Sequence, residues 1–449
     1  MKNMIGLRSV LLLSSLFGSC IGYPSALGNR ASVIPPIADP FYVPPQGYED
    51  TAPGTILRHR KVPHPIAAIE PVVLNLAGSY QVLYRSSDNF GNPTATITTV
   101  LVPENADPSK LLSYQIPEDS AFSNCAPSHV LQIGTTSSDI LSALGYQTHT
   151  ILFEAALKKG WIVSLPDFEG PHAAFLANRR AGHAVLDGIR AVLNTTDFTG
   201  ISPYASVSMW GYSGGSLATG FAAELQQSYA PDLDMIVGAV LGGVIGDIET
   251  VTYTVNNGPF VGLNFGGFHG IANEYPNIAT LIQEQLVDDA TKRAKFEDAN
   301  HNCFIANLLE YAFEDCFSYF KDRNILGYPQ FQQAFKDNNL GSRTPSMPIF
   351  AYKGYLDEVS PSSGTETIVS KYCASGATVN YKDVLTHEHI LLQLDGFLEP
   401  IAWLEKRMNG EPMQPGCQRT NELLPLAESG SLDTLVLTVE GEVDNILHV

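Results

Sequence analysis

Residues 210–220 read WGYSGGSLATG, and Ser213 stands there between glycines in the pattern G-x-S-x-G. The run VSMW before Gly211 is strand-like, and residues 216–229 have the pattern of a helix. A serine on a sharp turn from strand to helix is typical of a hydrolytic nucleophile, because the glycines give such a turn its backbone clearance. The pattern also occurs by chance in glycine-rich loops, so the rest of the chain must distinguish the two interpretations.

Strand-like and helix-like segments alternate on both sides of this turn. Residues 79–103 read as two alternating β-runs joined by a turn, and helix-like runs stand at 176–194 and 216–229. Further strand-like runs are found at 110–117, 161–166, 235–244, 347–354 and 377–385. This alternation predicts an α/β fold with a mainly parallel sheet flanked by helices.

A serine hydroxyl needs a base, and the base needs a carboxylate that holds its tautomer. In the α/β-hydrolase arrangement the acid and the histidine follow the serine in that order, each after a strand. The acid is assigned to Asp357, just after the run ending at Gly354, in preference to the adjacent Glu358. Two histidines follow the next strand-like run. His389 directly precedes a helix-like segment and is preferred, with His387 as the alternative.

The spacing His-x-His also resembles a metal pair on a strand, but no further cluster of ligands accompanies it. No metal or organic cofactor is therefore expected. The other histidines considered are assigned structural roles: His129, His172, His183 and His269.

Two backbone N–H groups are expected to bind a developing oxyanion. Gly214 begins the helix after the serine, where free N–H groups and the positive end of the helix dipole face outward. The second donor is assigned to the backbone N–H of Asp119, at the turn after the run 110–117, in preference to Ser120. An aspartate that caps the next helix is an equally good interpretation of position 119.

A long helix-rich insertion interrupts the predicted sheet. About a hundred residues separate the runs 235–244 and 347–354, too many for a simple loop, so we expect a helical cap or lid there. The predicted divisions are a signal peptide (1–22), a proline-rich N-terminal arm (23–66), the hydrolase core in two parts (67–243 and 343–417), the cap (244–342) and an acidic C-terminal tail (418–449).

The first residues indicate export. Lys2 and Arg8 precede an apolar run over 10–17, and small residues follow it, as in a secretory signal peptide too short to span a membrane. No later run of eighteen apolar residues occurs, so no transmembrane segment is expected. The prolines of the arm exclude a regular helix or a central strand, which predicts a segment laid over the domain.

The negative net charge argues against binding to nucleic acid and against electrostatic binding to anionic membranes. The formal net charge is −20, and removal of the signal peptide with Lys2 and Arg8 makes it more negative. Such a surface repels the phosphates of nucleic acid and of anionic membranes. Any contact with lipid must therefore be hydrophobic.

The cysteines indicate an oxidising compartment. Cys20 leaves with the leader, and the other five are widely spaced without a C-x-x-C pair. Two disulfides and one free thiol are expected, and zinc ligation is the weaker alternative. The five are Cys125, Cys303, Cys316, Cys373 and Cys417. One glycosylation sequon, N-T-T, starts at Asn194.

From about Tyr80 to Trp403 the chain resembles the fungal secretory lipases. The resemblance rests on these stretches: YQVLYRSSDNFGNPTATITTVLVP, YQIPEDSAFSNCAPS, LPDFEGPHAAFLANRRAG, WGYSGGSLATGFAAEL, NNGPFVGLNFGGFHGIANEYP, and GYLDEVSP followed by EHILLQLDG. It implies the nucleophile Ser213, the acid Asp357 and the histidine His389, in agreement with the motif analysis. It also implies oxyanion donors at Asp119 and Gly214, and a cap whose apolar residues cover an acyl tunnel.

The resemblance further implies the disulfides Cys125–Cys303 and Cys373–Cys417, which leaves Cys316 unpaired. An alternative pairing, Cys125–Cys316, stays open. The function it implies is a secreted triacylglycerol lipase that acts on acylglycerol or other esters at a lipid–water interface. The alternatives are a short-chain esterase or acyltransferase with the same triad, a peptidase, and a non-catalytic lipid-binding protein.

Overall fold

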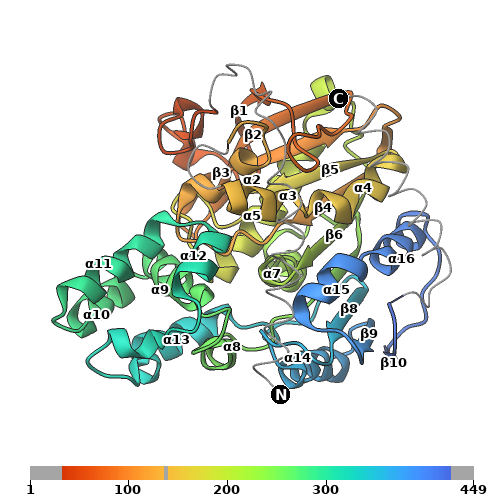
Figure 1. Ribbon diagram of the computed structural model, residues 1–449. Helices are drawn as coiled ribbons and strands as arrows, with labels where there is room; N and C mark the ends of the chain where they lie inside the picture. Colours follow the sequence, from red (N-terminus) through yellow and green to blue (C-terminus); the bar gives the residue numbers. More distant parts are fainter. Residues whose placement is uncertain (1–32, 136–139, 426–449) are drawn as a thin grey trace.

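The structure is a computed structural model that describes residues 33–135 and 140–425 (Figure 1). The predicted signal peptide and residues 426–449 of the predicted tail lie outside the described residues. In the described part of the chain, the strands are β1 (Ile56–Lys61), β2 (Gly78–Ser87), β3 (Pro93–Val102), β4 (Asp107–Gln115), β5 (Trp161–Pro166), β6 (Ser206–Tyr212), β7 (Ile236–Gly242), β8 (Ile349–Gly354), β9 (Val379–Val384) and β10 (Cys417–Glu422).

These strands form one sheet in the order β1-β2-β3-β5-β4-β6-β7-β8-β9-β10. The neighbours from β5 to β10 pair in parallel, whereas β1, β2 and β3 pair antiparallel at one end of the sheet. The central parallel strands are buried on both faces, as their continuous apolar runs require. The sheet and its helices form an α/β-hydrolase fold, as expected from the sequence.

Helices cover both faces of the sheet, and each face has its own hydrophobic core. One core contains residues of α5 (Asn178–Leu193), α7 (Gly214–Tyr229) and α14 (Ser362–Ala374). The other contains residues of α2 (Pro127–Val130), α3 (Ile140–Gln147), α4 (Thr150–Lys158), α15 (His389–Asp395) and α16 (Leu398–Met408). The short helix α6 (Thr196–Thr199) connects α5 to β6. Short 3-10 helices lie at Pro40–Tyr42, Tyr48–Asp50, Ser123–Cys125, Ala299–His301, Cys316–Tyr319 and Ile325–Gly327.

The chain between β7 and β8 forms a group of helices beside the sheet, coloured green to cyan in Figure 1. Aromatic and aliphatic side chains of these helices make a third core of their own. Loop-closure entropy rises only slowly with loop length, so such an insertion adds little to the cost of closing the β7–β8 connection. The helices are α8 (Ile248–Val255), α9 (Gly262–Glu274), α10 (Pro276–Gln285), α11 (Ala290–Asp298), α12 (Phe304–Tyr311) and α13 (Pro329–Asn338).

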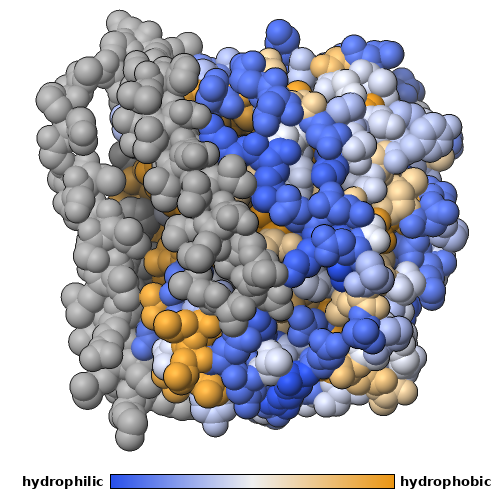
Figure 2. All heavy atoms as spheres, turned by 90° about the vertical axis from the view of Figure 1, so that its right-hand side faces the viewer, coloured by the Kyte–Doolittle hydropathy of each residue, from blue (hydrophilic) through white to orange (hydrophobic). Residues whose placement is uncertain are grey.

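Both outer strands of the sheet come from segments that the sequence analysis places outside the core. The predicted arm contains β1, which pairs with β2 at the sheet edge, where proline-rich chain can be accommodated. The predicted tail begins at 418, but β10 continues to Glu422 and pairs in parallel with β9. Its side chains are mostly exposed, so its sequence carries no apolar alternation to indicate a strand. On the face shown in Figure 2, hydrophilic residues predominate among the coloured atoms, and a hydrophobic patch is visible at the lower left.

Candidate active site

Ser213 lies on the turn between β6 and α7, with φ of 54° and ψ of −122°. A non-glycine residue at positive φ is strained, and such strain concentrates at functional sites. The neighbouring glycines are sterically required. A Cβ on Gly215 would lie 2.0 Å from the carbonyl oxygen of Gln115, and one on Gly211 would lie 2.1 Å from that of Gly215. The turn therefore has the geometry predicted for a nucleophile on a strand-to-helix turn.

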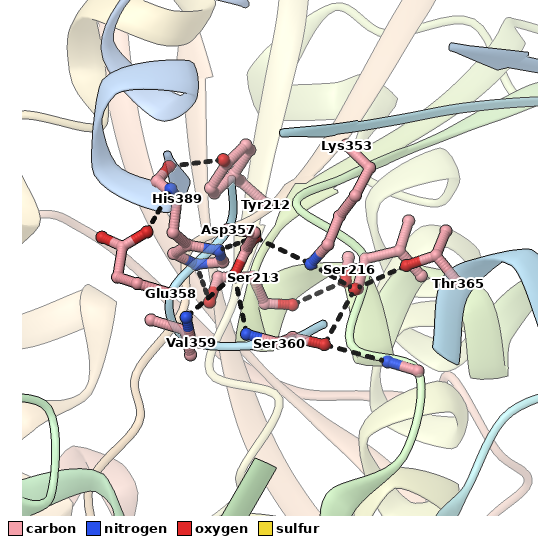
Figure 3. Close-up of polar contacts among 12 residues, drawn as sticks. Tyr212, Ser213, Ser216, Lys353, Asp357, Glu358, Val359, Ser360, Thr365 and His389 are labelled. Atoms are coloured by element: carbon pink, nitrogen blue, oxygen red, sulfur yellow. Dashed lines mark hydrogen bonds and ion pairs between the residues drawn. The ribbon is translucent and has the colours of Figure 1, made fainter. Parts of the chain in front are cut away.

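The structure brings the three predicted triad residues together (Figure 3). His389 Nε2 lies 2.8 Å from Ser213 Oγ, and His389 Nδ1 lies 2.6 Å from Asp357 Oδ2. Ser213 follows β6, Asp357 follows β8, and His389 begins α15 after β9. The carboxyl ends of these parallel strands share one edge of the sheet, so residues far apart in the chain meet there.

Asp357 is buried and fully surrounded by donors. Its Oδ1 accepts the backbone N–H groups of Val359 at 2.9 Å and Ser360 at 2.6 Å. Its Oδ2 also lies 2.8 Å from Lys353 Nζ. Burial acts to raise the pKa of Asp357, but His389 and Lys353 outweigh it and hold that pKa well below its usual range. The carboxylate is thus ionised and oriented toward the imidazole.

Further contacts fix the backbone of His389. Its N–H donates to Glu358 Oε2 at 2.7 Å, and its carbonyl accepts the Tyr212 hydroxyl at 2.6 Å. Glu358, the alternative acid, thus accepts from the backbone of His389, whereas Asp357 lies against its imidazole. His387, the alternative histidine, contacts Asp395 Oδ2 through Nε2 at 2.8 Å.

The two predicted oxyanion residues lie beside Ser213 but differ in their donors. Gly214 is the first residue of α7, and N–H groups in a first turn have no intrahelical acceptor. The N–H of Asp119 instead donates to Glu169 Oε1 at 3.0 Å. The sequence led us to expect this N–H group to bind the oxyanion. In the structure it already has an acceptor in Glu169. Asp119 has a positive φ of 46°, and its Oδ1 atom is buried without a hydrogen-bond partner.

A group of buried carboxyls beside Asp119 was not identified from sequence. Glu118, Asp167 and Glu169 are buried with it, and the Glu169 N–H donates to Glu118 Oε1 at 3.2 Å. Burial raises the pKa of Asp119 and of Asp167 to about 7, and raises those of both glutamates well above their usual range. The acidic residues that follow β4 and β5, in PEDS and PDFEG, are the sequence signal that could have identified this cluster.

Two cavities meet at Ser213. One is lined mainly by apolar side chains, including Leu217 of α7 and Val251 of α8. The other is lined by His389 and by more polar groups, among them Thr148 and Gln393. Ser213 and Asp119 line both. The apolar residues of the first cavity include Phe175, Leu176, Phe268, Ile271, Leu326 and Phe331.

The cysteines pair as the resemblance implies. Disulfides join Cys125 to Cys303 and Cys373 to Cys417, and Cys316 is a buried free thiol. The alternative Cys125–Cys316 pair does not form. Burial raises the pKa of the Cys316 thiol to about 12, so it stays protonated at neutral pH.

The remaining candidate residues lie away from the serine. Asn194 is exposed at the end of α5. His183 and His269 contact backbone carbonyls, of Asp88 and Phe296. Within 33–135 and 140–425, His, Cys, Asp and Glu side chains form no group of three or more suited to hold a metal ion. Among the helices of the described residues, none has the length and apolarity needed to cross a membrane.

Comparison with known proteins identifies the family of the chain. Residues 136–416 match the family described as secretory lipase. Lipase A of Arthroderma benhamiae is 43% identical over 419 residues, which cover 93% of this chain and 88% of that protein. Lipase 1 of Candida albicans is 36% identical over 423 residues, covering 92% of this chain and 89% of that protein.

Solved structures show the same fold. The crystal structure of Candida antarctica lipase A in its closed state superposes with a TM-score of 0.82 at 28% identity, covering 92% of this chain and 96% of that chain. A cell wall degrading esterase of Xanthomonas oryzae shares the fold, with a TM-score of 0.61 at 16% identity over 80% of this chain and all of that one. The chain belongs to the secretory lipase family.

Proposed function

We propose that this protein is a secreted triacylglycerol lipase that hydrolyses long-chain acylglycerol esters through a serine acyl-enzyme. The observation that carries the proposal is the hydrogen-bonded series Ser213–His389–Asp357, whose serine lines an apolar cavity. Membership of the secretory lipase family supports the same conclusion.

In acylation, Ser213 Oγ attacks the ester carbonyl carbon while His389 Nε2 takes the hydroxyl proton. Asp357, which is already ionised, accepts the Nδ1–H hydrogen bond and stabilises the imidazolium. The tetrahedral intermediate then collapses, the C–O bond to glycerol breaks, and His389 returns the proton to the leaving alkoxide. A diacylglycerol leaves and the fatty acyl group remains on Ser213.

In deacylation, water occupies the position that the glycerol oxygen leaves. His389 takes a proton from this water as its oxygen attacks the acyl carbon, and the second intermediate releases the fatty acid. Ser213 recovers its proton from His389. The cycle needs a neutral imidazole at its start, because only that form can take the hydroxyl proton.

The oxyanion is proposed to bind the Gly214 amide and the Asp119 side chain. The Asp119 amide already donates to Glu169, whereas its Oδ1 is buried, unpartnered and packed against Gly214. A neutral carboxylic acid donates one O–H hydrogen bond, and burial raises the pKa of Asp119 to about 7, which favours that form. Each such donor typically contributes roughly 2.7–4 kcal/mol to transition-state stabilisation.

The apolar cavity is proposed to hold the acyl chain. Its lining comes largely from α8, α9 and α13, the helices of the proposed cap at 244–342, and those side chains can bury a chain that water solvates poorly. The second cavity, which contains His389, is proposed to hold the glycerol side of the ester. Long-chain esters therefore fit this site better than short ones.

Export is part of the proposal. Two disulfides in the structure, the leader-like residues 1–22 and the family all support secretion into an oxidising compartment. Exposed Asn194 is proposed to carry a glycan on this route.

The Ser213→Ala variant tests the mechanism. Hydrolysis of p-nitrophenyl esters and triolein should fall by at least about a thousandfold, because no other hydroxyl occupies the position of Oγ. Ser228→Ala, at the far end of α7, is the matched control and should keep wild-type rates. Retained hydrolysis in Ser213→Ala, or no labelling of Ser213 by a fluorophosphonate, would contradict the proposal.

Substrate class needs a separate measurement. Rates on tributyrin and triolein are compared below and above their solubility limits. A steep rise at the emulsion and a preference for triolein are expected of a lipase. Ordinary saturation below the limit would identify a short-chain esterase, and preferential transfer to added alcohol over water would identify an acyltransferase.

A further inference from the structure

Lys353 carries a buried positive charge beside the proposed triad. We propose that Lys353 is a positioning residue which, through Asp357, lowers the proton affinity of His389 and so extends activity to lower pH. The inference rests on the proposed Ser213–His389–Asp357 mechanism. It assigns a role to a residue that the mechanism above does not use.

The side chain of Lys353 is enclosed completely. It lies at the penultimate position of β8, and its exposed fraction is 0%. Its Nζ lies 2.8 Å from Asp357 Oδ2 and donates to the carbonyl oxygen of Val244 at 2.8 Å (Figure 3). An uncompensated ammonium ion in such a place is very costly, so the carboxylate beside it is the reason that the lysine is tolerated.

One oxygen atom of Asp357 serves both cations. Oδ2 accepts from His389 Nδ1 at 2.6 Å and also lies 2.8 Å from Lys353 Nζ. A carboxylate alone stabilises an imidazolium by charge attraction, but a carboxylate already paired with an ammonium ion has little net charge to offer. The imidazolium form of His389 is therefore less favoured than it would be beside Asp357 alone.

Several other carboxylates lie near His389 and Lys353. Glu358 and Asp119 face His389, and Glu358 and Asp383 add to Asp357 around Lys353. Burial lowers the pKa of Lys353, while Asp357, Glu358 and Asp383 act to raise it. Substitution of Lys353 leaves all these carboxylates in the chain, so the effect of the lysine charge can be isolated.

Lys353 also has a contact that must be separated from its charge. The carbonyl oxygen of Val244, just after β7, accepts from Lys353, from Ser360 Oγ at 3.4 Å and from Thr365 Oγ1 at 3.1 Å. Removal of the lysine leaves the two hydroxyls as donors. Lys353→Gln offers an amide N–H in place of the ammonium while removing the charge, whereas Lys353→Met removes both.

The test is the pH profile of kcat/KM on a soluble p-nitrophenyl ester. The acid limb is the part of this profile in which kcat/KM falls as the pH is lowered. In Lys353→Met and Lys353→Gln it should move to higher pH by about one unit, so that kcat/KM at a given pH on the limb is about tenfold lower than in the wild type. Lys353→Arg keeps the charge and should keep the wild-type limb. The matched control is Lys382→Met, which removes another buried lysine, one paired with Glu399 and Glu422 away from the triad.

The outcomes separate this inference from the mechanism. An acid limb that stays at its wild-type pH in folded Lys353→Gln would overturn the role of the lysine while leaving Ser213 as nucleophile. An equal shift in Lys382→Met would also overturn it, because the effect would then be general destabilisation. Inactivity of Lys353→Met with a shifted limb in Lys353→Gln would support the charge effect and add a structural role for the Val244 contact. Unaltered activity of Ser213→Ala, in contrast, would remove the mechanism itself.

Discussion

Asp119 Oδ1 occupies the space in which a side chain at position 214 would begin. A Cβ on Gly214 would lie 2.0 Å from this oxygen, so glycine is required there by the carboxyl group of a residue 95 positions earlier. Asp119 follows β4 and Gly214 follows β6, and these two strands are neighbours in the sheet. The two groups proposed to bind the oxyanion are thus held against each other by adjacent strands.

Gly214→Ala should lower kcat strongly and KM little. The new methyl group must displace the Asp119 carboxyl, and loss of one oxyanion donor typically costs about 2.7–4 kcal/mol, or 10²–10³ in kcat. Steady-state kinetics on p-nitrophenyl esters measures this. Gly266→Ala in α9 is the control, because its Cβ would meet only ordinary contacts from 3.4 Å, and it should keep its kcat.

Asp119→Asn should remove an alkaline loss of activity. Burial raises the pKa of Asp119 to about 7, so in the wild type the acid that donates to the oxyanion ionises above that pH and repels it. The amide of asparagine donates at every pH. We expect kcat/KM of the wild type to decline from about pH 7 upward and that of Asp119→Asn to stay flat.

The Asp119→Leu variant completes this experiment, since it cannot donate at any pH and should be slow throughout. If kcat/KM of Asp119→Asn declined at the same alkaline pH as that of the wild type, a group other than Asp119 would be responsible for the loss.

Val251→Trp should change chain-length preference. Val251 of α8 lines the apolar cavity and is only partly buried, so a larger side chain can enter the cavity from this position. The ratio of kcat/KM for palmitate over butyrate esters should fall by about tenfold or more. Tyr253→Trp changes a largely exposed residue of the same helix and should leave the ratio unchanged. Equal losses on both esters would place the acyl chain elsewhere.

Glu169→Gln should stabilise the protein at alkaline pH. Burial raises the pKa of Glu169 well above its usual range, with Glu118 and Asp119 adding to the effect. A group whose folded-state pKa is raised contributes stability that is present below its unfolded pKa and is lost as pH rises through the folded pKa. Glutamine stays neutral, so thermal unfolding should show a higher Tm than wild type at pH 8 and a smaller gain at pH 5, which lies nearer the unfolded pKa of glutamate.

Exposed Glu104→Gln is the control for that measurement and should shift Tm at neither pH. A Tm difference at pH 5 as large as that at pH 8 would show that Glu169 acts through packing and not through its charge.

Loss of the Cys373–Cys417 disulfide should destabilise the protein and release β10. The bond closes a loop with a sequence separation of 44, for which chain entropy predicts a stabilisation of about 4 kcal/mol. A Cys373→Ser/Cys417→Ser double variant should unfold at lower denaturant concentration, and hydrogen exchange should become faster in residues 417–422. Unchanged exchange there would mean that pairing with β9 alone holds the strand.

The sequence predicted the fold, and it selected three residues that the structure brings together, because each of these signals is local. Ser213 lies in a short glycine pattern between a strand and a helix, and Asp357 and His389 each follow an apolar run. Those runs match β6, β8 and β9 closely. The register of a buried parallel strand is set by such runs, so the ends of the strands, and the residues just beyond them, are predictable.

The parts that sequence did not predict depend on long-range contacts. Lys353 lies within an apolar strand-like run, where nothing local reveals that its charge faces Asp357. The engagement of the Asp119 amide depends on Glu169, which follows a different strand. β10 has exposed polar side chains, and its pairing with β9 begins at Cys417, which the disulfide fixes beside α14.

The helices between β7 and β8 have a consequence for how the protein can vary. They supply much of the wall of the apolar cavity but none of the residues proposed for bond cleavage, which follow β4, β6, β8 and β9. One continuous stretch of chain thus encodes most of the shape of the proposed acyl site, and separate stretches encode the residues of the proposed mechanism. Substitutions or exchanges confined to α8–α13 can therefore change which fatty acids are released while the machinery that releases them is inherited intact.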